Sequence, residues 1–187
     1  MESTPTAVGT VTGDEAIDGV LSLPDNVGSA VFTADYTAII AFGSTASSVS
    51  VTQDGSEPTN IRRSVTINDV RYISTSDTTS TCAVSTSDCT DGIDPARVSD
   101  TGVTPEFVFG DMAKRLRRDA MSLVGKATAT TREMPGGTAS CVDVQVSGGT
   151  KQYCVFPDGV LARFVGADVT IDVTDHRATV DESLFVV

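Results

Sequence analysis

Residues 141–164 read CVDVQVSGGTKQYCVFPDGVLARF and hold two of the four cysteines in a chain of 187 residues. In CVDVQV the valines alternate with Cys141 and polar residues, and in KQYCVF the aromatic Tyr153 alternates with Cys154. Alternation with a period of two residues is typical of a β-strand that has one buried face. The stretch therefore predicts antiparallel hairpins, with the cysteines on the more polar face.

The turn between these two strands decides whether the cysteines can pair. A two-residue turn at Ser147-Gly148 sets Cys141 directly opposite Cys154, and a disulfide needs Cα atoms about 4.4–6.8 Å apart. A Gly148-Gly149 turn would shift the two cysteines out of register. A disulfide hypothesis therefore predicts the Ser147-Gly148 turn, or a bulge beside the glycines.

The next hairpin follows directly. Asp158-Gly159 is a strong signal for a type I′ turn. Such a turn places Ala162 and Phe164 across from Val155 and Tyr153.

The other two cysteines lie in TCAVSTSDCT, a segment rich in Ser, Thr and Asp. Four cysteines allow three pairings, and we favour Cys82–Cys89 with Cys141–Cys154 because both are local. A zinc site with four cysteine ligands is the alternative, but the sequence has no CxxC spacing. Paired cysteines imply an oxidising compartment.

Strand patterns extend to both sides. Residues 168–175 alternate around Ile171, and residues 30–42 place Tyr36, Ile40 and Phe42 on one face. Further strands are predicted in three stretches: 48–54, 61–67 and 70–74, with turns at Asp54-Gly55 and Asn68-Asp69. Residues 75–102 are rich in Ser, Thr, Asp and Gly, which marks an excursion from the sheet.

One helix is predicted after this excursion. Thr104 is a candidate N-cap, Pro105 suits the first helical position, and Gly125 can end the helix. Apolar residues recur at helical spacing: Phe109, Met112, Ala113, Leu116, Ala120 and Leu123. The basic run of residues 114–118 is interpreted as the solvated face of this helix.

An amphipathic helix must bury its apolar stripe, and the sheet offers the only predicted apolar face. The fold class is therefore α+β and mostly β, with a curved antiparallel sheet (a half-barrel) around one main α-helix. Residues 1–25 are predicted to be a flexible or loosely ordered lead, and residues 26–187 a single domain. Alternation suggests that a cavity between helix and sheet is lined by Tyr36, Ile40, Phe109, Met112, Leu116, Val144, Tyr153, Phe164 and Ile171.

The second half of the chain resembles a known group of proteins. A helix followed by a strand ending in GG-A-C, a hairpin with a second cysteine before FPDG, and the closing DESLF at residues 181–185 are similar to actinobacterial cell-envelope lipoproteins of the LolA/LppX/LprG-like superfamily. The resemblance covers residues 103–187. It implies a half-barrel sheet with a helix over its concave face, an extracytoplasmic location and lipid carriage in some members. It also implies a lipid anchor at the N-terminus, but the sequence shows no lipobox cysteine.

Composition excludes several partners. The formal net charge is −12, which disfavours nucleic acid and broad electrostatic docking on an anionic membrane. No apolar run reaches the 18 or more residues of a membrane span. The start MESTPTAVGT lacks the basic and apolar regions of a signal peptide.

No signature of an enzyme is found. The sequence contains no GxSxG, HExxH, P-loop or GxGxxG motif, and no cofactor is predicted. The only histidine, His176, is interpreted as a surface residue. Asp88, Asp91 and Asp94 recur every third residue and raise a calcium hypothesis for the loop of residues 88–100, although turns and helix capping explain them more simply. No metal site is predicted.

Two functions therefore stay open. The first is a non-enzymatic, exported or cell-envelope protein that carries a lipid or another hydrophobic ligand between helix and sheet. The second is an extracellular protein-interaction module with a solid core, which binds through the 75–102 excursion. The first predicts a cavity of several hundred Å³, on the order of known ligand pockets.

Overall fold

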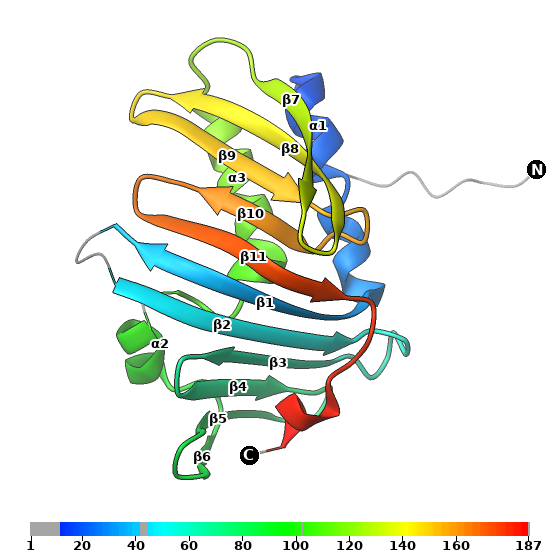
Figure 1. Cartoon of the computed structure of the whole chain (residues 1–187), viewed down its shortest axis with the longest axis vertical. Coiled ribbons are helices and arrows are strands. Elements are labelled where there is room, and N and C mark those ends of the chain that lie inside the picture. The colour runs from blue at the N-terminus through cyan, green and yellow to red at the C-terminus, as the bar shows by residue number, and fades with distance from the viewer. Residues whose placement is uncertain (1–11, 42–44, 102, 187) are drawn as a thin grey trace, which may run out of the picture.

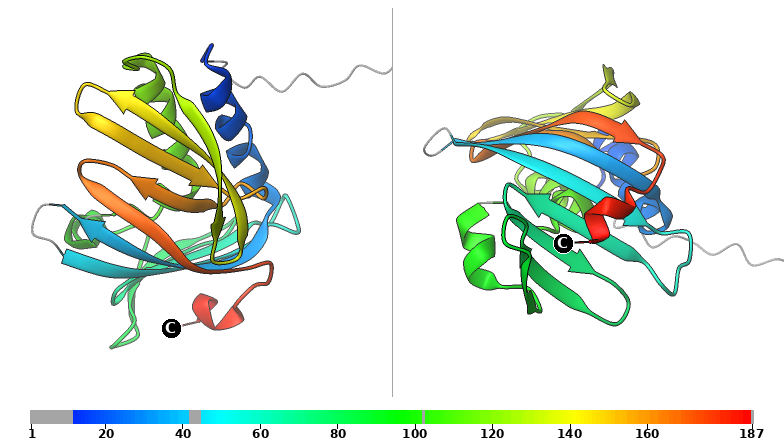
Figure 2. Two further views of the ribbon diagram at one scale, coloured as in Figure 1. Left: turned by 45° about the horizontal axis from the view of Figure 1, so that its top comes forward. Right: turned by 60° about the horizontal axis from the view of Figure 1, so that its bottom comes forward.

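The computed structural model describes residues 12–41, 45–101 and 103–186. These residues form one antiparallel, eleven-stranded sheet in the order β6-β5-β4-β3-β2-β1-β11-β10-β9-β8-β7 (Figure 1). The sheet is curved, and the helices α1 and α3 lie on its concave side (Figure 2). The predicted fold class, a curved antiparallel sheet around a helix, is confirmed.

The elements have the following bounds. The strands of the first half are β1 (Val31–Ile40), β2 (Thr45–Asp54), β3 (Arg62–Ile67), β4 (Val70–Ser74), β5 (Thr79–Ala83) and β6 (Asp88–Asp91). Those of the second half are β7 (Thr128–Met134), β8 (Gly137–Val146), β9 (Gly149–Val155), β10 (Leu161–Val165) and β11 (Val169–Arg177). The helical elements are α1 (Glu15–Leu21), η1 (Pro24–Ser29), α2 (Pro95–Thr101), η2 (Phe107–Asp111), α3 (Met112–Met121) and η3 (Glu182–Phe185).

The two halves of the chain are two meanders that meet in the middle of the sheet. Within each half, strands that are consecutive in sequence pair with each other. Strands β1 and β11 then pair across the centre, with Thr33 opposite Arg177 at one end and Ile40 opposite Val169 at the other. We call this β1–β11 pairing the seam.

The register predicted for the cysteine hairpin is confirmed. Val146 lies opposite Gly149, so Ser147 and Gly148 form the two-residue turn, and Cys141 lies opposite Cys154. The structure contains the disulfides Cys141–Cys154 and Cys82–Cys89, which are the two local pairs that the sequence favoured.

The turn at Asp158-Gly159 differs from the predicted type I′ turn. Gly159 has a φ of +87°, but Asp158 does not have a positive φ. The Gly159 N–H donates to the carbonyl of Phe156 at 2.9 Å, which places Pro157 and Asp158 at the centre of the turn. Proline favours that second position, because its fixed φ suits a turn of this kind.

The Phe156 N–H donates to the Val160 carbonyl at 2.9 Å, so residues 157–159 form a three-residue loop, which changes the local register. Leu161, and not Ala162, lies opposite Val155, and an irregularity between Leu161 and Arg163 restores Phe164 to its predicted place opposite Tyr153. A glycine is required at position 159, because a Cβ there would lie 2.5 Å from the carbonyl oxygen of Leu23.

The predicted helix forms with altered ends. It starts with the π-helical turn η2, in which the Asp111 N–H donates to the Glu106 carbonyl at 3.2 Å, and continues as α3. Thr104 is not an N-cap; its hydroxyl donates to the Asp111 carboxylate at 3.0 Å. The extra residue in the π turn lets Phe107, Val108 and Phe109 all be buried. The helix ends at Met121, four residues before Gly125.

The prediction of a loosely ordered lead at residues 1–25 is corrected where the structure describes it. Asp14 caps α1 by accepting the backbone N–H groups of Ala16 and Ile17. Ile17, Val20 and Leu21 are buried in the core. Three apolar residues at helical spacing behind an N-cap give this segment a face that packs on the sheet. Residues 1–11 and Phe42 lie outside the described residues.

The 75–102 excursion contains regular structure. Strands β5 and β6 extend the sheet at one edge, with Cys82 opposite Cys89, and α2 follows. The Asp94 carboxylate accepts the N–H of Ala96 at 2.9 Å, as the helix-capping alternative to calcium expects. No group of three His, Cys, Asp or Glu side chains is placed to hold a metal in the described ranges.

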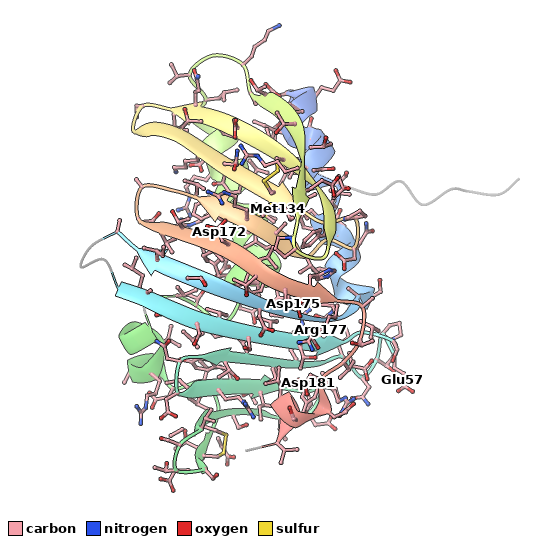
Figure 3. The ribbon with its side chains drawn as sticks, viewed as in Figure 1. Glu57, Met134, Asp172, Asp175, Arg177 and Asp181 are labelled. Atoms are coloured by element: carbon pink, nitrogen blue, oxygen red, sulfur yellow. A yellow bond between two sulfur atoms is a disulfide. The ribbon has the colours of Figure 1, made fainter. Side chains whose placement is uncertain are left out.

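The convex face of the sheet is polar. Figure 3 shows Asp172, Asp175 and Arg177 on the side that faces away from α3. Arg177 pairs with Asp35 at 3.4 Å and with Asp175 at 2.8 Å.

Residues 178–186 cross this convex face beside β1–β4, and we call them the C-terminal strap. The carbonyl of Thr179 accepts from the Thr33 hydroxyl at 2.7 Å, and the carbonyl of Ser183 accepts from Arg71 at 3.2 Å. The strap thereby covers buried polar side chains: Thr33, Thr52, Ser64 and Arg71.

Candidate functional site

The interface between α3 and the sheet is filled with side chains. Seven of the nine residues predicted to line a cavity there are at most 2% exposed and line none of the cavities described below: Tyr36, Met112, Leu116, Val144, Tyr153, Phe164 and Ile171. The structure therefore brings these residues together, on one helix and five strands, as a packed core. As ligand contacts they remain a prediction.

The two tyrosines of this core have internal hydrogen-bond partners. The Tyr36 hydroxyl donates to the Leu161 carbonyl at 2.9 Å, and the Tyr153 hydroxyl donates to the Asp119 carboxylate. Asp119 also accepts from the Lys151 ammonium at 2.7 Å. Burial, together with the hydrogen bond to Asp119, raises the pKa of Tyr153. Both hydroxyls are therefore used in bonds within the protein.

A cavity of about 340 Å³ lies at the edge of the helix–sheet interface, and we call it the apolar cavity. Its walls come from β3, β4, the start of β5, the α2 region and the chain that leads into α3. The lining residues are Arg63, Val65, Tyr72, Ser74, Thr79, Ile93, Val98, Thr104, Pro105, Glu106, Phe109 and Asp111. Phe109 is the one predicted cavity residue found here.

Local packing explains why Arg63 lies at this cavity. The Gln53 side chain is buried, and its amide donates to the Ala30 carbonyl at 2.9 Å. Its carbonyl oxygen accepts from Nε of Arg63 at 2.7 Å, and the Arg63 guanidinium lies 4.5 Å from the centre of the Phe109 ring. Glu106 is 4.0 Å away across the rim. The cavity therefore combines apolar walls with three charged side chains: Arg63, Glu106 and Asp111.

A second cavity, of about 360 Å³, lies on the other side of residues 103–111. We call it the cationic groove. Its lining residues are Ile40, Val103, Thr104, Phe107, Asp111, Lys114, Arg115, Arg118, Asp168 and Val169. Ile40 is the predicted cavity residue found here. The basic run of residues 114–118 thus forms a groove wall at Lys114, Arg115 and Arg118, in addition to a solvated face.

Arg115 is fixed in this groove. Its guanidinium pairs with Asp168 and lies 5.6 Å from the centre of the Phe107 ring and 5.3 Å from that of Phe164. The hydrogen bond from Arg115 lowers the pKa of Asp168. Lys114 pairs with Asp111 at 3.0 Å. Among the described residues, Arg118 is in no ion pair.

His176 is not the surface residue that the sequence suggested. Its side chain is 10% exposed, its Nε2 is 3.0 Å from Asp158, and its ring stacks on Phe156 with centres 4.5 Å apart. The polar neighbours in TDHRAT indicated an exposed histidine. The burial could not be predicted from them, because the residues that cover His176 come from the distant turns at Gly136 and Asp158. The pair joins β11 to the turn between β9 and β10, and it lines neither the apolar cavity nor the cationic groove.

Sequence reasoning missed most of the apolar cavity. Val65 lies in the strand predicted at 61–67, but Ile93 and Val98 lie in a segment whose composition indicated only an excursion. Their spacing of five residues across Asp94-Pro95 gives no strand or helix period. The available signal was the presence of two branched apolar residues in the mostly polar stretch 85–102.

No protein-family model and no curated protein sequence matches the chain. Solved structures do match this chain in fold. At such low sequence identity the likeness shows the fold alone.

Several of the matching structures contain MucB. A crystal structure of MucB matches with a TM-score of 0.60 and 8% identity, over 95% of this chain and 64% of that one. The MucA/MucB complex of Pseudomonas aeruginosa matches with a TM-score of 0.57 and 12% identity, over 91% and 60%. This chain therefore spans about three fifths of the MucB structures. LprF from Mycobacterium bovis matches at a TM-score of 0.47 with 12% identity over 89% and 95%, a likeness too weak to support an inference.

The comparisons support the half-barrel fold that the LolA/LppX/LprG-like resemblance implied. They do not support its restriction to actinobacterial lipoproteins.

Proposed function

We propose that this chain is a non-enzymatic, extracytoplasmic binding protein that takes a lipid chain or another hydrophobic ligand into the apolar cavity. The observation that carries the proposal is a cavity of about 340 Å³ with Val65, Ile93 and Phe109 among its walls. Ligand pockets span about 300–1,000 Å³ and are mostly apolar with a few polar groups. This cavity fits at the small end of that range, so it suits one chain and not a multi-chain lipid.

The disulfides support the proposed location. Both pairs of cysteines form disulfides, which persist in oxidising compartments. No helix in the described ranges is both long and apolar enough to cross a bilayer. A membrane tether through a preceding lipid anchor is compatible with this proposal and is part of the family resemblance.

The site lies away from the place expected from alternation. The centre of the helix–sheet interface is packed, and open space remains beside the π turn η2, next to Ile93, Val98 and residues 104–106. A ligand can therefore enter without unpacking α3.

Occupancy of the cavity can be tested by blocking it. Thr79 is exposed and lines the cavity, so Thr79→Trp puts a large side chain into the mouth. We expect lipid extraction and mass spectrometry to find a bound chain in the wild type and at least tenfold less in this variant. Titration with N-phenyl-1-naphthylamine, a neutral fluorescent apolar probe, should show the same loss.

Thr128→Trp is the matched control, because Thr128 is exposed on β7 and lines none of the cavities described above. It should bind like the wild type. A wild type that contains no lipid and does not bind the probe, or a Thr79→Trp variant that binds normally, would contradict the proposal.

A protein partner is the second candidate. Ile93 is 43% exposed at the rim, so the 75–102 excursion presents an apolar side chain to solvent beside the cavity. One matching structure is a complex of MucB with MucA, which makes a protein ligand for this fold a reasonable hypothesis. Ile93→Asp should abolish capture of a partner in a pull-down from periplasmic or culture fluid, with unchanged circular dichroism. If no partner is captured by the wild type, this candidate loses its support.

A further inference from the structure

The apolar cavity and the cationic groove are neighbours. Both are lined by Thr104 and Asp111, whose side chains are joined by a hydrogen bond of 3.0 Å. This pair is therefore a wall that the two spaces share. One cavity is apolar and the other carries most of the local positive charge.

The charge in the groove is unusual for this protein. The chain has a net charge of −12, yet the groove is lined by Lys114, Arg115 and Arg118 against the carboxylates of Asp111 and Asp168. Arg115 and Lys114 are paired with these carboxylates, and Arg118 is in no ion pair among the described residues. A positive surplus therefore remains, and Arg118 supplies it.

The two cationic ends lie on the same side of α3. Lys114 and Arg118 are four residues apart, so they are adjacent on the helix surface. Both are exposed. Beneath them the groove has an apolar floor that includes Phe107 and Val169. An anion with an apolar extension fits this combination, because a fully hydrated small anion would leave the floor unused.

We propose that the ligand is a single-chain amphiphile with an anionic head, whose chain occupies the apolar cavity and whose head lies in the cationic groove against Lys114 and Arg118. This inference rests on the proposed function, and it names the class of ligand. The head passes the Thr104–Asp111 pair and competes with Asp111 for Lys114. A neutral chain of the same length gains only the burial of its apolar atoms, and a cationic one meets Lys114 and Arg118 as like charges.

Three probes with the same chain separate these cases: dodecanoate, dodecanol and dodecyltrimethylammonium. Each is titrated, below its micelle concentration, against the full chain loaded with N-phenyl-1-naphthylamine. We expect dodecanoate to displace the dye at roughly fivefold to tenfold lower concentration than dodecanol, and the cationic probe to be the weakest, since exposed ion pairs are modest individually. The preference for dodecanoate should shrink in 0.5 M NaCl, because salt screens exposed charges.

The head position is tested by Lys114→Gln with Arg118→Gln. This double variant should lose the preference for dodecanoate and bind dodecanol as before. Lys126→Gln with Arg132→Gln is the matched control, because it removes two exposed positive charges from residues that line neither cavity. It should keep the preference.

The outcomes separate the two proposals. If dodecanol displaces the dye as well as dodecanoate does, the anionic head is wrong and the apolar ligand stands. If both double variants lose the preference equally, overall charge and not the groove is responsible, and the head position is wrong. If none of the three probes displaces the dye, the proposed function fails as well.

Discussion

Asp158, in the β9–β10 turn, lies against His176 of β11, with Nε2 of the imidazole 3.0 Å from the carboxylate. Burial alone raises the pKa of the Asp158 carboxyl, but the hydrogen bond from His176, the N–H of Val160 and the charge of His176 together bring that pKa below its ordinary value. Val160 donates to the carboxylate at 3.1 Å. The folded state therefore binds a proton on Asp158 less readily than the unfolded state does.

This difference predicts a pH dependence. The stability that ionised Asp158 contributes is fully present above its unfolded pKa of about 3.9 and is lost as the pH falls through the lower folded value. Asp158→Asn should lower the free energy of unfolding by on the order of 1 kcal/mol at pH 5, with solvent screening allowed for. The difference from wild type should shrink towards pH 3 in urea unfolding curves. Asp77→Asn, at an exposed site, is the control and should show no such trend. A gap that stays constant with pH would contradict the assignment.

Single residues were predictable where an alternating or helical pattern fixed their side. Val144, Ile171 and Leu116 are buried as the periods require. Asp119 was missed because a charged residue is expected to face solvent, although it lies three residues after Leu116 on the same stripe. Its partners Tyr153 and Lys151 come from β9, and sequence spacing does not show such a contact.

The two disulfides differ in what they hold together. Cys141 and Cys154 are both buried and join two neighbouring strands inside the sheet, whereas Cys89 is exposed on the edge strand β6. The sequence separations of 13 and 7 residues give similar closure entropies, about 2–3 kcal/mol each. The surroundings of the bonds should therefore decide the difference between them.

We expect Cys141→Ala with Cys154→Ala to lower the free energy of unfolding by about 3–5 kcal/mol, and Cys82→Ala with Cys89→Ala by about 2 kcal/mol or less. The second variant should also speed amide hydrogen exchange in β5 and β6, because an edge hairpin can open without global unfolding. Urea unfolding and hydrogen-exchange mass spectrometry measure both effects. Equal losses of stability, with no local change in exchange, would show that closure entropy alone matters.

Elements with one buried face were predictable, and those defined by distant contacts were not. Strands β1, β8 and β11 alternate strongly, and the Ser147-Gly148 turn followed from the disulfide. Strand β6 is exposed along its length and has no alternation to detect. The π turn η2 could not be predicted from the helical spacing. It adds one residue to the turn, and this residue shifts the apolar positions at the start of the helix relative to those in α3. Helix α1 had a detectable signal in Asp14, Ile17 and Leu21, but the polar composition around it favoured a loose lead.

At the scale of the whole molecule, the C-terminal strap holds together the convex side of the first meander. Arg62 pairs with Glu182 at 2.9 Å, and the Asp181 N–H donates to the Thr52 hydroxyl at 3.1 Å. Removing the strap would expose a row of polar groups that are now buried and satisfied by it.

A chain truncated after Arg177 should keep the sheet and lose about 2–4 kcal/mol of its free energy of unfolding, since several hydrogen bonds at roughly 1 kcal/mol each disappear while water replaces part of them. Urea unfolding measures the loss, and binding of N-phenyl-1-naphthylamine checks that the apolar cavity is intact. Glu182→Gln, which removes only the ion pair between the exposed Glu182 and Arg62, should cost less than about 1 kcal/mol. A truncated chain as stable as the full one would show that the strap does not stabilise the fold.

The architecture as a whole was predictable from one argument, that an apolar helical stripe needs an apolar sheet face. The order of the strands was not, because the seam pairs β1 with β11, which are more than a hundred residues apart in sequence. The location of the cavity was not predictable either, since it depends on how completely side chains fill the centre.

The seam also determines how the molecule responds to mechanical tension. Because β1 begins where β11 ends, with Thr33 opposite Arg177, force applied to the segments before β1 and after β11 is transmitted to the same end of this pairing. Such a load breaks the hydrogen bonds between the two strands one residue pair after another and does not slide the strands past each other. Once the strap and α1 are detached, the sheet should separate at low force into its two meanders. Each meander would still contain its own disulfide.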